Sequence, residues 1–291
     1  MTAASPVATL RAGQDVAGVF ACTRKDRLVS RTGTPYLALE LRDRTGAVPA
    51  RAFRDADVFA GRFERGDVVR VAGRVERFRD ELVVDVRAVA RVAPDDVDPA
   101  AFLPVAYRDV DELDGFLEHL AGEVTDRGFA ALLALLLGDE ELRGAWRRAP
   151  CTRTGHHAYL GGLLEHTVAV ATLAVEACAL HPRLEHDLLV TAALVHDLGK
   201  TREFTYGAEI GLSEEGRLLG HVSLGLRLLE DAVRAVRLDD ARAVALAHCV
   251  LTHHGPDAAP GRRFGSPEAL ALYRLNALDA SVKDALEHGL G

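Results

Sequence analysis

The sequence predicts an α+β chain of two parts, a five-stranded β-barrel followed by an all-α domain. Three observations lead to this fold class. Short segments rich in β-branched residues, separated by turn residues, fill residues 12–93. An acidic segment bounded by prolines follows at residues 94–99. Beyond it, apolar residues recur at three- and four-residue spacing almost to the end of the 291 residues.

The barrel is predicted from the order of its elements. Strands are expected at residues 16–21, 36–41, 48–53, 68–75 and 82–89, and a short helix at residues 55–65. Five strands with a helix after the third is the order of the OB fold, a small Greek-key barrel that often holds single-stranded nucleic acid. We therefore interpret residues 1–93 as an OB-fold nucleic-acid-binding domain.

The rest of the chain is predicted to be helical. Residues 94–110 are expected to form a linker, residues 111–150 a helical connector, and residues 151–291 the second domain. Periodic apolar residues predict helices at 111–126, 129–137, 160–180, 187–198, 220–236, 240–254 and 267–288.

Charge and cysteine usage limit the class of protein. The net charge is −8, but residues 1–99 carry 17 basic and 15 acidic residues, whereas residues 100–291 carry 18 and 28. This asymmetry suggests different roles for the two parts. The four cysteines form no C-x-x-C pair, which fits a reducing cytosol. With a longest apolar run of only residues 129–137 and no secretory pattern, a cytoplasmic protein without a membrane partner is expected.

Several histidines and aspartates lie in otherwise apolar predicted helices. They are His166, His196, Asp197, His221, His253, His254 and Asp279. Each has a structural alternative: a lone buried histidine is usually a hydrogen-bonded core residue, and a His-His-Gly helix end can be a cap. As a set, however, so many buried polar groups would be costly without a shared cation. Imidazole and carboxylate are ligands that divalent ions accept without thiolates.

This constellation resembles the HD-domain phosphohydrolase superfamily. The resemblance implies His166, His196, Asp197 and Asp279 as ligands of a first metal ion. Two-metal members add histidines that His221 and either His253 or His254 match, and Asp197 would then bridge two ions. The second domain is therefore expected to be an HD domain.

A narrower resemblance is carried by five segments. They are His156-His-Ala-Tyr-Leu-Gly-Gly-Leu-Leu-Glu-His-Thr, His196-Asp-Leu-Gly-Lys, Glu215-Gly-Arg-Leu-Leu-Gly-His, Thr252-His-His-Gly and Gly265-Ser-Pro. They are similar to the YhaM-type 3′→5′ exoribonucleases, which also join an OB fold to an HD domain. The chain departs from that pattern at Asn276, where an acid is expected one turn before Asp279, and at Glu165, where some relatives have a second histidine.

The resemblance implies metal-assisted phosphodiester hydrolysis. Two divalent ions can lower the pKa of a shared water and clamp the oxygens of a phosphoryl displacement, here releasing nucleoside 5′-monophosphates from a single strand. Mn²⁺ is favoured because imidazole suits it better than Mg²⁺, with Mg²⁺, Fe²⁺ and Co²⁺ as alternatives. Lys200 is the candidate for stabilising phosphate charge, the alternative being a solvated lysine at a helix end. Asp197 is the second catalytic candidate.

In the barrel, a basic groove with aromatic faces would hold the strand. The candidates are Tyr36, Arg51, Phe53, Arg54, Arg77, Phe78 and Arg79. Burial of the aromatic side chains in the barrel core is the alternative for each, and Phe78 is the strongest candidate because it is predicted to lie in a turn between two arginines.

Two other functions remain open at this point. The chain could hydrolyse small or cyclic nucleotides with the barrel as a regulator, or it could be a non-catalytic single-strand-binding adaptor. The sequence leaves open the choice between RNA and DNA, and whether the chain forms a homo-oligomer.

Overall fold

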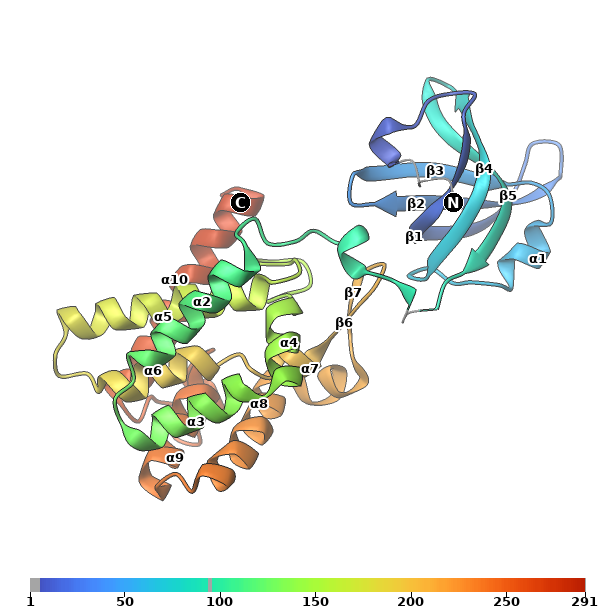
Figure 1. Ribbon diagram of the computed structural model, residues 1–291. Coiled ribbons are helices and arrows are strands. Elements are labelled where there is room, and N and C mark those ends of the chain that lie inside the picture. Colours follow the sequence, from blue (N-terminus) through green and yellow to red (C-terminus); the bar gives the residue numbers. More distant parts are fainter. Residues whose placement is uncertain (1–5, 94–95, 291) are drawn as a thin grey trace. The chain divides into compact units, whose positions relative to one another are not determined.

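The computed structural model describes residues 6–93 and 96–290, so the first two residues of the predicted linker lie outside the described part. The chain forms two compact units (Figure 1). The first comprises Met1–Pro104 together with Tyr206–Ile210, and the second comprises Val105–Thr205 and Gly211–Gly291.

The first unit contains a closed five-stranded barrel. Its strands are β1 (Asp15–Val29), β2 (Pro35–Asp43), β3 (Gly46–Ala52), β4 (Val68–Phe78) and β5 (Glu81–Arg91), with helix α1 (Ala56–Ala60) between β3 and β4. The strand order is β1-β2-β3-β5-β4, and β4 pairs with β1 to close the barrel. Only the β3–β5 pairing is parallel among these strands. This is the predicted OB fold.

Alternation of side chains builds the barrel core. In β2, Leu37, Leu39 and Leu41 are buried, and the residues between them face outward. The same alternation in β4 buries Val69, Val71 and Val75. Strand β1 extends eight residues beyond its predicted end at residue 21, because its polar second half pairs with β2 in spite of its composition.

The second unit is an assembly of helices. They are α2 (Val110–Gly122), α3 (Arg127–Gly138), α4 (Glu140–Arg148), α5 (Gly162–Leu180), α6 (His186–Val195), α7 (Lys200–Glu203), α8 (Glu214–Val236), α9 (Asp240–Thr252) and α10 (Pro267–His288). A short hairpin, β6 (Phe204–Tyr206) and β7 (Ile210–Leu212), interrupts them. Neither this hairpin nor α4 and α7 was predicted.

Helices α2 to α4 are part of the helical core, so the predicted helical connector is not a separate part of the molecule. Trp146 of α4 is 1% exposed and donates its indole N–H to Thr167 of α5 at 3.3 Å. Asp114 of α2, also buried, accepts hydrogen bonds from Arg143 and Arg147 of α4. Burying a carboxylate is costly unless it is paired in this way.

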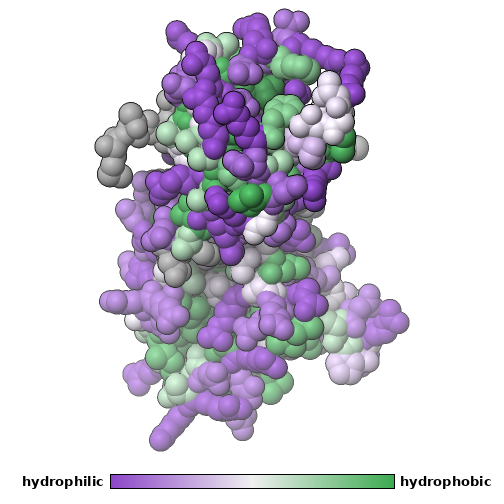
Figure 2. Space-filling model, turned by 90° about the vertical axis from the view of Figure 1, so that its right-hand side faces the viewer, coloured by the Kyte–Doolittle hydropathy of each residue, from purple (hydrophilic) through white to green (hydrophobic). Residues whose placement is uncertain are grey.

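Helix α5 runs through the apolar core of the second unit. Its 19 residues have the length and mean hydropathy (1.5) of a membrane span, and half of that window is buried. Such composition is also that of a core helix, and Leu163, Leu164 and Val170 pack in the apolar core. On the face of the molecule shown in Figure 2, apolar areas are interrupted by hydrophilic side chains.

Candidate metal centre

The predicted metal ligands come from five segments of the helical unit. His166 lies on α5, and His196-Asp197 follows α6 directly. His221 lies on α8, His253-His254 follows α9, and Asp279 lies on α10. Both adjacent pairs, His196-Asp197 and His253-His254, therefore lie at helix ends. There neighbouring side chains can face one centre, although residues within a helix point about 100° apart.

Glycines at two positions bring these segments together. A Cβ atom on Gly199 would lie 1.9 Å from the carbonyl oxygen of His221, so only glycine permits this approach of the turn after Asp197 to α8. Gly220, with φ 68° and ψ 161°, kinks α8 immediately before His221. The kink lets the N–H of His221 donate to Glu203 at 3.1 Å.

Three ligand atoms form what we call the first half-site: Nε2 of His166, Nε2 of His196 and Oδ2 of Asp197. The two nitrogens are 3.2 Å apart, and they lie 3.6 and 3.4 Å from the carboxylate oxygen. All three side chains are buried. Their ligand atoms lie close enough to share one cation.

The other oxygen of Asp197 belongs to what we call the second half-site, with His221, His253 and His254. Oδ1 lies 3.5 Å from Nε2 of His221 and 3.4 Å from Nε2 of His253. Nε2 of His221 lies 2.9 Å from Nε2 of His254. The structure thus brings both His253 and His254 to the centre, and each oxygen of Asp197 faces a different half-site.

The protonation of these imidazoles follows from their outer hydrogen bonds. Nδ1 of His196 lies 2.8 Å from the carbonyl of Ala193, and Nδ1 of His253 lies 2.5 Å from that of Val250. A carbonyl only accepts, so in the neutral ring each Nδ1 holds the proton and each Nε2 holds a lone pair. Burial lowers the pKa of His166 to about 4 and that of His254 to about 3, which keeps both rings neutral near pH 7.

Two buried atoms of the centre show that it fits a cation. Among the described residues, Oδ1 of Asp197 and Nε2 of His253 are buried without a hydrogen-bond partner. Burial raises the pKa of Asp197, but Lys200 and His196 outweigh this effect and hold the pKa well below its ordinary value. A buried carboxylate and several imidazole nitrogens converge on this centre, and such a donor set suits divalent ions.

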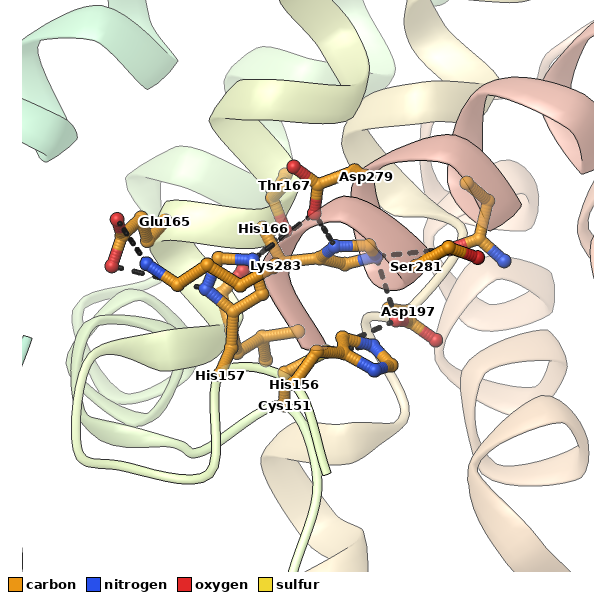
Figure 3. A network of polar contacts seen from close by, with 12 residues as sticks. Cys151, His156, His157, Glu165, His166, Thr167, Asp197, Asp279, Ser281 and Lys283 are labelled. Carbon is orange, nitrogen blue, oxygen red and sulfur yellow. Dashed lines mark hydrogen bonds and ion pairs between the residues drawn. The ribbon is translucent and has the colours of Figure 1, made fainter. Parts of the chain in front are cut away.

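Asp279, a further predicted ligand, lies beside the first half-site and contacts the outer edge of the His166 ring. Its Oδ2 lies 2.6 Å from Nδ1 of His166 and 3.0 Å from Nε2 of His157. Figure 3 shows the His166 ring between Asp279 and Asp197. Because Nδ1 and Nε2 are on different edges of the ring, Asp279 contacts the edge that faces away from His196 and groups with His157 and His166, so its role as a metal ligand stays a prediction.

Lys200 is buried rather than solvated. Its ammonium lies 2.7 Å from Oδ2 of Asp197 and donates to the sulfur of Cys151 at 3.3 Å. Burial lowers the pKa of Lys200, but Asp197 outweighs this and raises it, so the side chain stays charged. A fixed cation therefore stands beside the carboxylate on which both half-sites depend.

A second group of polar side chains continues from Asp279 through His157 toward Glu165 and Lys283 (Figure 3). His157 lies 2.9 Å from the hydroxyl of Tyr159, which donates to Glu165 at 2.7 Å. Lys283 donates to the other oxygen of Glu165 at 3.3 Å. Burial raises the pKa of Glu165, yet hydrogen bonds from His157 and Tyr159 lower it to about 2. Sequence reasoning missed Tyr159 and Lys283, because nothing in their spacing indicates contact with the centre.

Most of the candidate nucleic-acid-binding residues of the barrel share its outer surface. The rings of Tyr36 and Phe53 stack with centroids 4.9 Å apart. The guanidinium carbons of Arg51 and Arg79 lie 4.1 and 5.4 Å from the centroid of Phe78.

The barrel core, the alternative considered for the aromatic residues, does not contain Phe53 or Phe78, which are 43% and 45% exposed. Phe78 is the last residue of β4 rather than part of the turn, which Arg79 and Asp80 make with positive φ. Strand alternation places Arg77 on the opposite face of β4 from Phe78, and Arg54 is exposed beyond the end of β3.

Comparison with known families agrees with the division of the chain into a barrel and a helical unit. Residues 163–287 match the family model described as HD domain. Residues 19–90 match the model described as OB-fold nucleic acid binding domain.

Curated relatives are similar over most of the chain. A protein named 3′-5′ exoribonuclease YhaM from Halalkalibacterium halodurans is 25% identical over 277 residues, which cover 93% of this chain and 84% of the relative. The protein of the same name from Bacillus subtilis is 26% identical over 261 residues, covering 87% and 81%. Among solved structures, the second OB-fold domain of replication protein A from Methanococcus maripaludis matches 30% of this chain and 93% of its own, with 18% identity and a TM-score of 0.26.

Proposed function

We infer that this chain, which belongs to the YhaM-type proteins with an OB-fold domain and an HD domain, is a metal-dependent 3′→5′ exoribonuclease. Its substrate would be single-stranded RNA, with single-stranded DNA as a further substrate, and its products nucleoside 5′-monophosphates. The observation that carries the proposal is Asp197, whose two oxygens face two sets of buried imidazoles.

The residues of the centre would hold two divalent ions, with Mn²⁺ favoured over Mg²⁺ by the preponderance of imidazole. When bound, such ions activate water and neutralise the charge of a phosphodiester. The buried first half-site and the second half-site would fix their ligand atoms through the hydrogen bonds of His196 and His253 to backbone carbonyls. Lys200 keeps Asp197 ionised and adds positive charge close to the reacting phosphate.

The aromatic and basic residues on the barrel surface favour a polymeric substrate over a mononucleotide. Phe78 with Arg51 and Arg79, and Tyr36 with Phe53, offer outward aromatic faces and cations for consecutive bases and phosphates. A hydrolase of small nucleotides gains nothing from such a surface. Holding the strand on the same chain as the metal centre raises the local concentration of its end.

The direction of hydrolysis can be tested with labelled RNA. We expect the full chain with Mn²⁺ to shorten a 5′-labelled single strand stepwise from its free 3′ end, giving a ladder on a denaturing gel. Chelation or a blocked 3′ end should stop the reaction, because both ions and a free terminus are required. Cleavage of small nucleotides with intact RNA would favour the small-nucleotide hydrolase, and binding without any cleavage would favour the adaptor.

Removing the aromatic ring of Phe78 tests the barrel surface. Phe78→Ala should weaken binding of a single-stranded oligonucleotide about tenfold, because stacking contributes about 1–3 kcal/mol per base. Fluorescence anisotropy with a chelator present measures binding without hydrolysis. Phe116→Ala is the matched control, since Phe116 is 42% exposed beside Arg108 but lies on α2 of the helical unit. Equal affinities of wild type and Phe78→Ala would remove this surface from the proposal.

A further inference from the structure

Asn276 of α10 contacts the first half-site. This is the position at which the chain departs from the family pattern, where an acid is expected. Its side chain is 6% exposed, and its Oδ1 lies 3.0 Å from Nε2 of His166. Its Nδ2 donates to the backbone carbonyl of His253 at 3.2 Å. The amide therefore touches residues of both half-sites.

The orientation of this amide is determined by its partners. If the two ends of the amide were exchanged, Oδ1 would face the carbonyl oxygen of His253, and two acceptors would meet at hydrogen-bond distance. The observed orientation satisfies the carbonyl and directs Oδ1 toward His166. The amide oxygen is thus held in place as an acceptor.

In its neutral form the His166 ring carries its single proton on the edge that faces Asp279, not on the edge that faces this oxygen. Its Nδ1 lies 2.6 Å from the carboxylate of Asp279, which accepts the proton of the neutral ring. Nε2 then holds a lone pair, and it faces Oδ1 of Asn276 as well as Nε2 of His196. Exchanging the tautomer would instead set a lone pair against the Asp279 carboxylate, which is less favourable.

Acceptor atoms therefore gather around one point: Nε2 of His166, Nε2 of His196, Oδ2 of Asp197 and Oδ1 of Asn276. Nε2 of His166 lies 3.2 Å from Nε2 of His196, 3.6 Å from Oδ2 of Asp197 and 3.0 Å from Oδ1 of Asn276. Lone pairs at these distances repel one another unless a cation lies between them.

We propose that Asn276, through its side-chain oxygen, is the fourth protein ligand of the first half-site, and that Asp279 is a positioning residue that holds His166. This inference rests on the metal dependence in the proposed function. The first half-site has a neutral amide where a carboxylate would add charge, so Asp197 is, among the described residues, the only charged ligand of either half-site. Metal affinity rises with the number of charged ligands, so a carboxylate in place of the Asn276 amide would tighten binding at the first half-site.

Isosteric substitutions distinguish the ligand role of Asn276 from the positioning role of Asp279. Wild type, Asn276→Asp, Asn276→Leu and Asp279→Asn are prepared as full chains, stripped with a chelator and titrated with Mn²⁺ by calorimetry, with bound ions counted by mass spectrometry. Asn276→Asp should tighten the ion of the first half-site at least about tenfold by adding a charged ligand. Asn276→Leu should lose that ion and keep the other.

Asp279→Asn should keep both ions, because its amide oxygen still accepts the proton of His166. Asp279→Leu, which has no acceptor, should weaken the first ion by about 10–100-fold. Circular dichroism checks that each variant is folded; if Asn276→Leu is not, the change in affinity of Asn276→Asp decides.

The outcomes distinguish this inference from the proposed function. Unchanged Mn²⁺ binding in both Asn276 variants, or loss of an ion in Asp279→Asn with both ions retained in Asn276→Leu, would overturn it. A wild-type chain that binds no ion would instead overturn the metal dependence itself. These measurements need no RNA, so they stand even if the substrate is different.

Discussion

Asp197→Asn is expected to lower the rate of RNA hydrolysis by about 10³-fold or more, which corresponds to about 4 kcal/mol of transition-state stabilisation. In the described part of the chain, Asp197 supplies the only carboxylate that faces both half-sites, with its oxygens 3.4–3.6 Å from four imidazole nitrogens. An amide has the same shape, but it is neutral, and its nitrogen end has no lone pair for a cation. One half-site would therefore lose its oxygen ligand, and both would lose charge.

The measurement is single-turnover cleavage of a labelled RNA by the full chain, together with the number of bound metal ions. Asp231→Asn is a suitable control, because it makes the same chemical change on α8 at a side chain that is 82% exposed. We expect this control to cleave at the wild-type rate. Wild-type cleavage by Asp197→Asn would mean that the centre described here does not carry the reaction.

The second large effect is on thermal stability. Divalent metal at about 100 times its dissociation constant should raise the melting temperature of the helical unit by about 5–10 °C, because binding at that excess contributes about 2.7 kcal/mol. In the absence of a cation, the orphaned Oδ1 of Asp197 and Nε2 of His253 remain buried and unsatisfied, which destabilises the fold. Helices α5, α6 and α9 meet at these residues, so the effect should extend through the unit.

Scanning calorimetry with chelator and with added Mn²⁺ measures this shift. The barrel supplies an internal control, because the ligand atoms all lie in the helical unit and any separate barrel transition should not move. Asp197→Asn provides another comparison, since its metal-dependent shift should be much smaller. A melting profile that is identical with and without metal would contradict the proposal of a metal centre.

The sequence predicted the histidines of the centre because their surroundings are informative. His166 and His196 lie in runs of apolar residues, and burial of several imidazoles needs a common partner. The choice between Asn276 and Asp279 could not be made in this way. The two are three residues apart on α10, which places both on one face of the helix, and only the packed position of His166 decides which one meets Nε2.

Helices and strands whose residues show no periodic apolar pattern could not be predicted from the sequence either. Helix α4 has nine residues of mostly charged composition, and its burial depends on Trp146 and on the two arginines that pair with Asp114. The second half of β1 is polar and is a strand because β2 lies beside it. In both cases tertiary contacts, rather than local preference, determine the structure.

The single carboxylate shared by the half-sites affects how the enzyme meets a polyanion. With two divalent ions in place, four positive charges and the Lys200 ammonium would face Asp197, with Asp279 and Glu203 behind the imidazoles. The balance is an excess of positive charge, although residues 100–291 carry 18 basic and 28 acidic residues. A strand of RNA would thus be repelled by the average surface of this unit and attracted at one point. This local positive potential would attract the end of the RNA strand to the metal centre, whereas the acidic surface around it would repel the rest of the strand. The range of the attraction would decrease as salt is added.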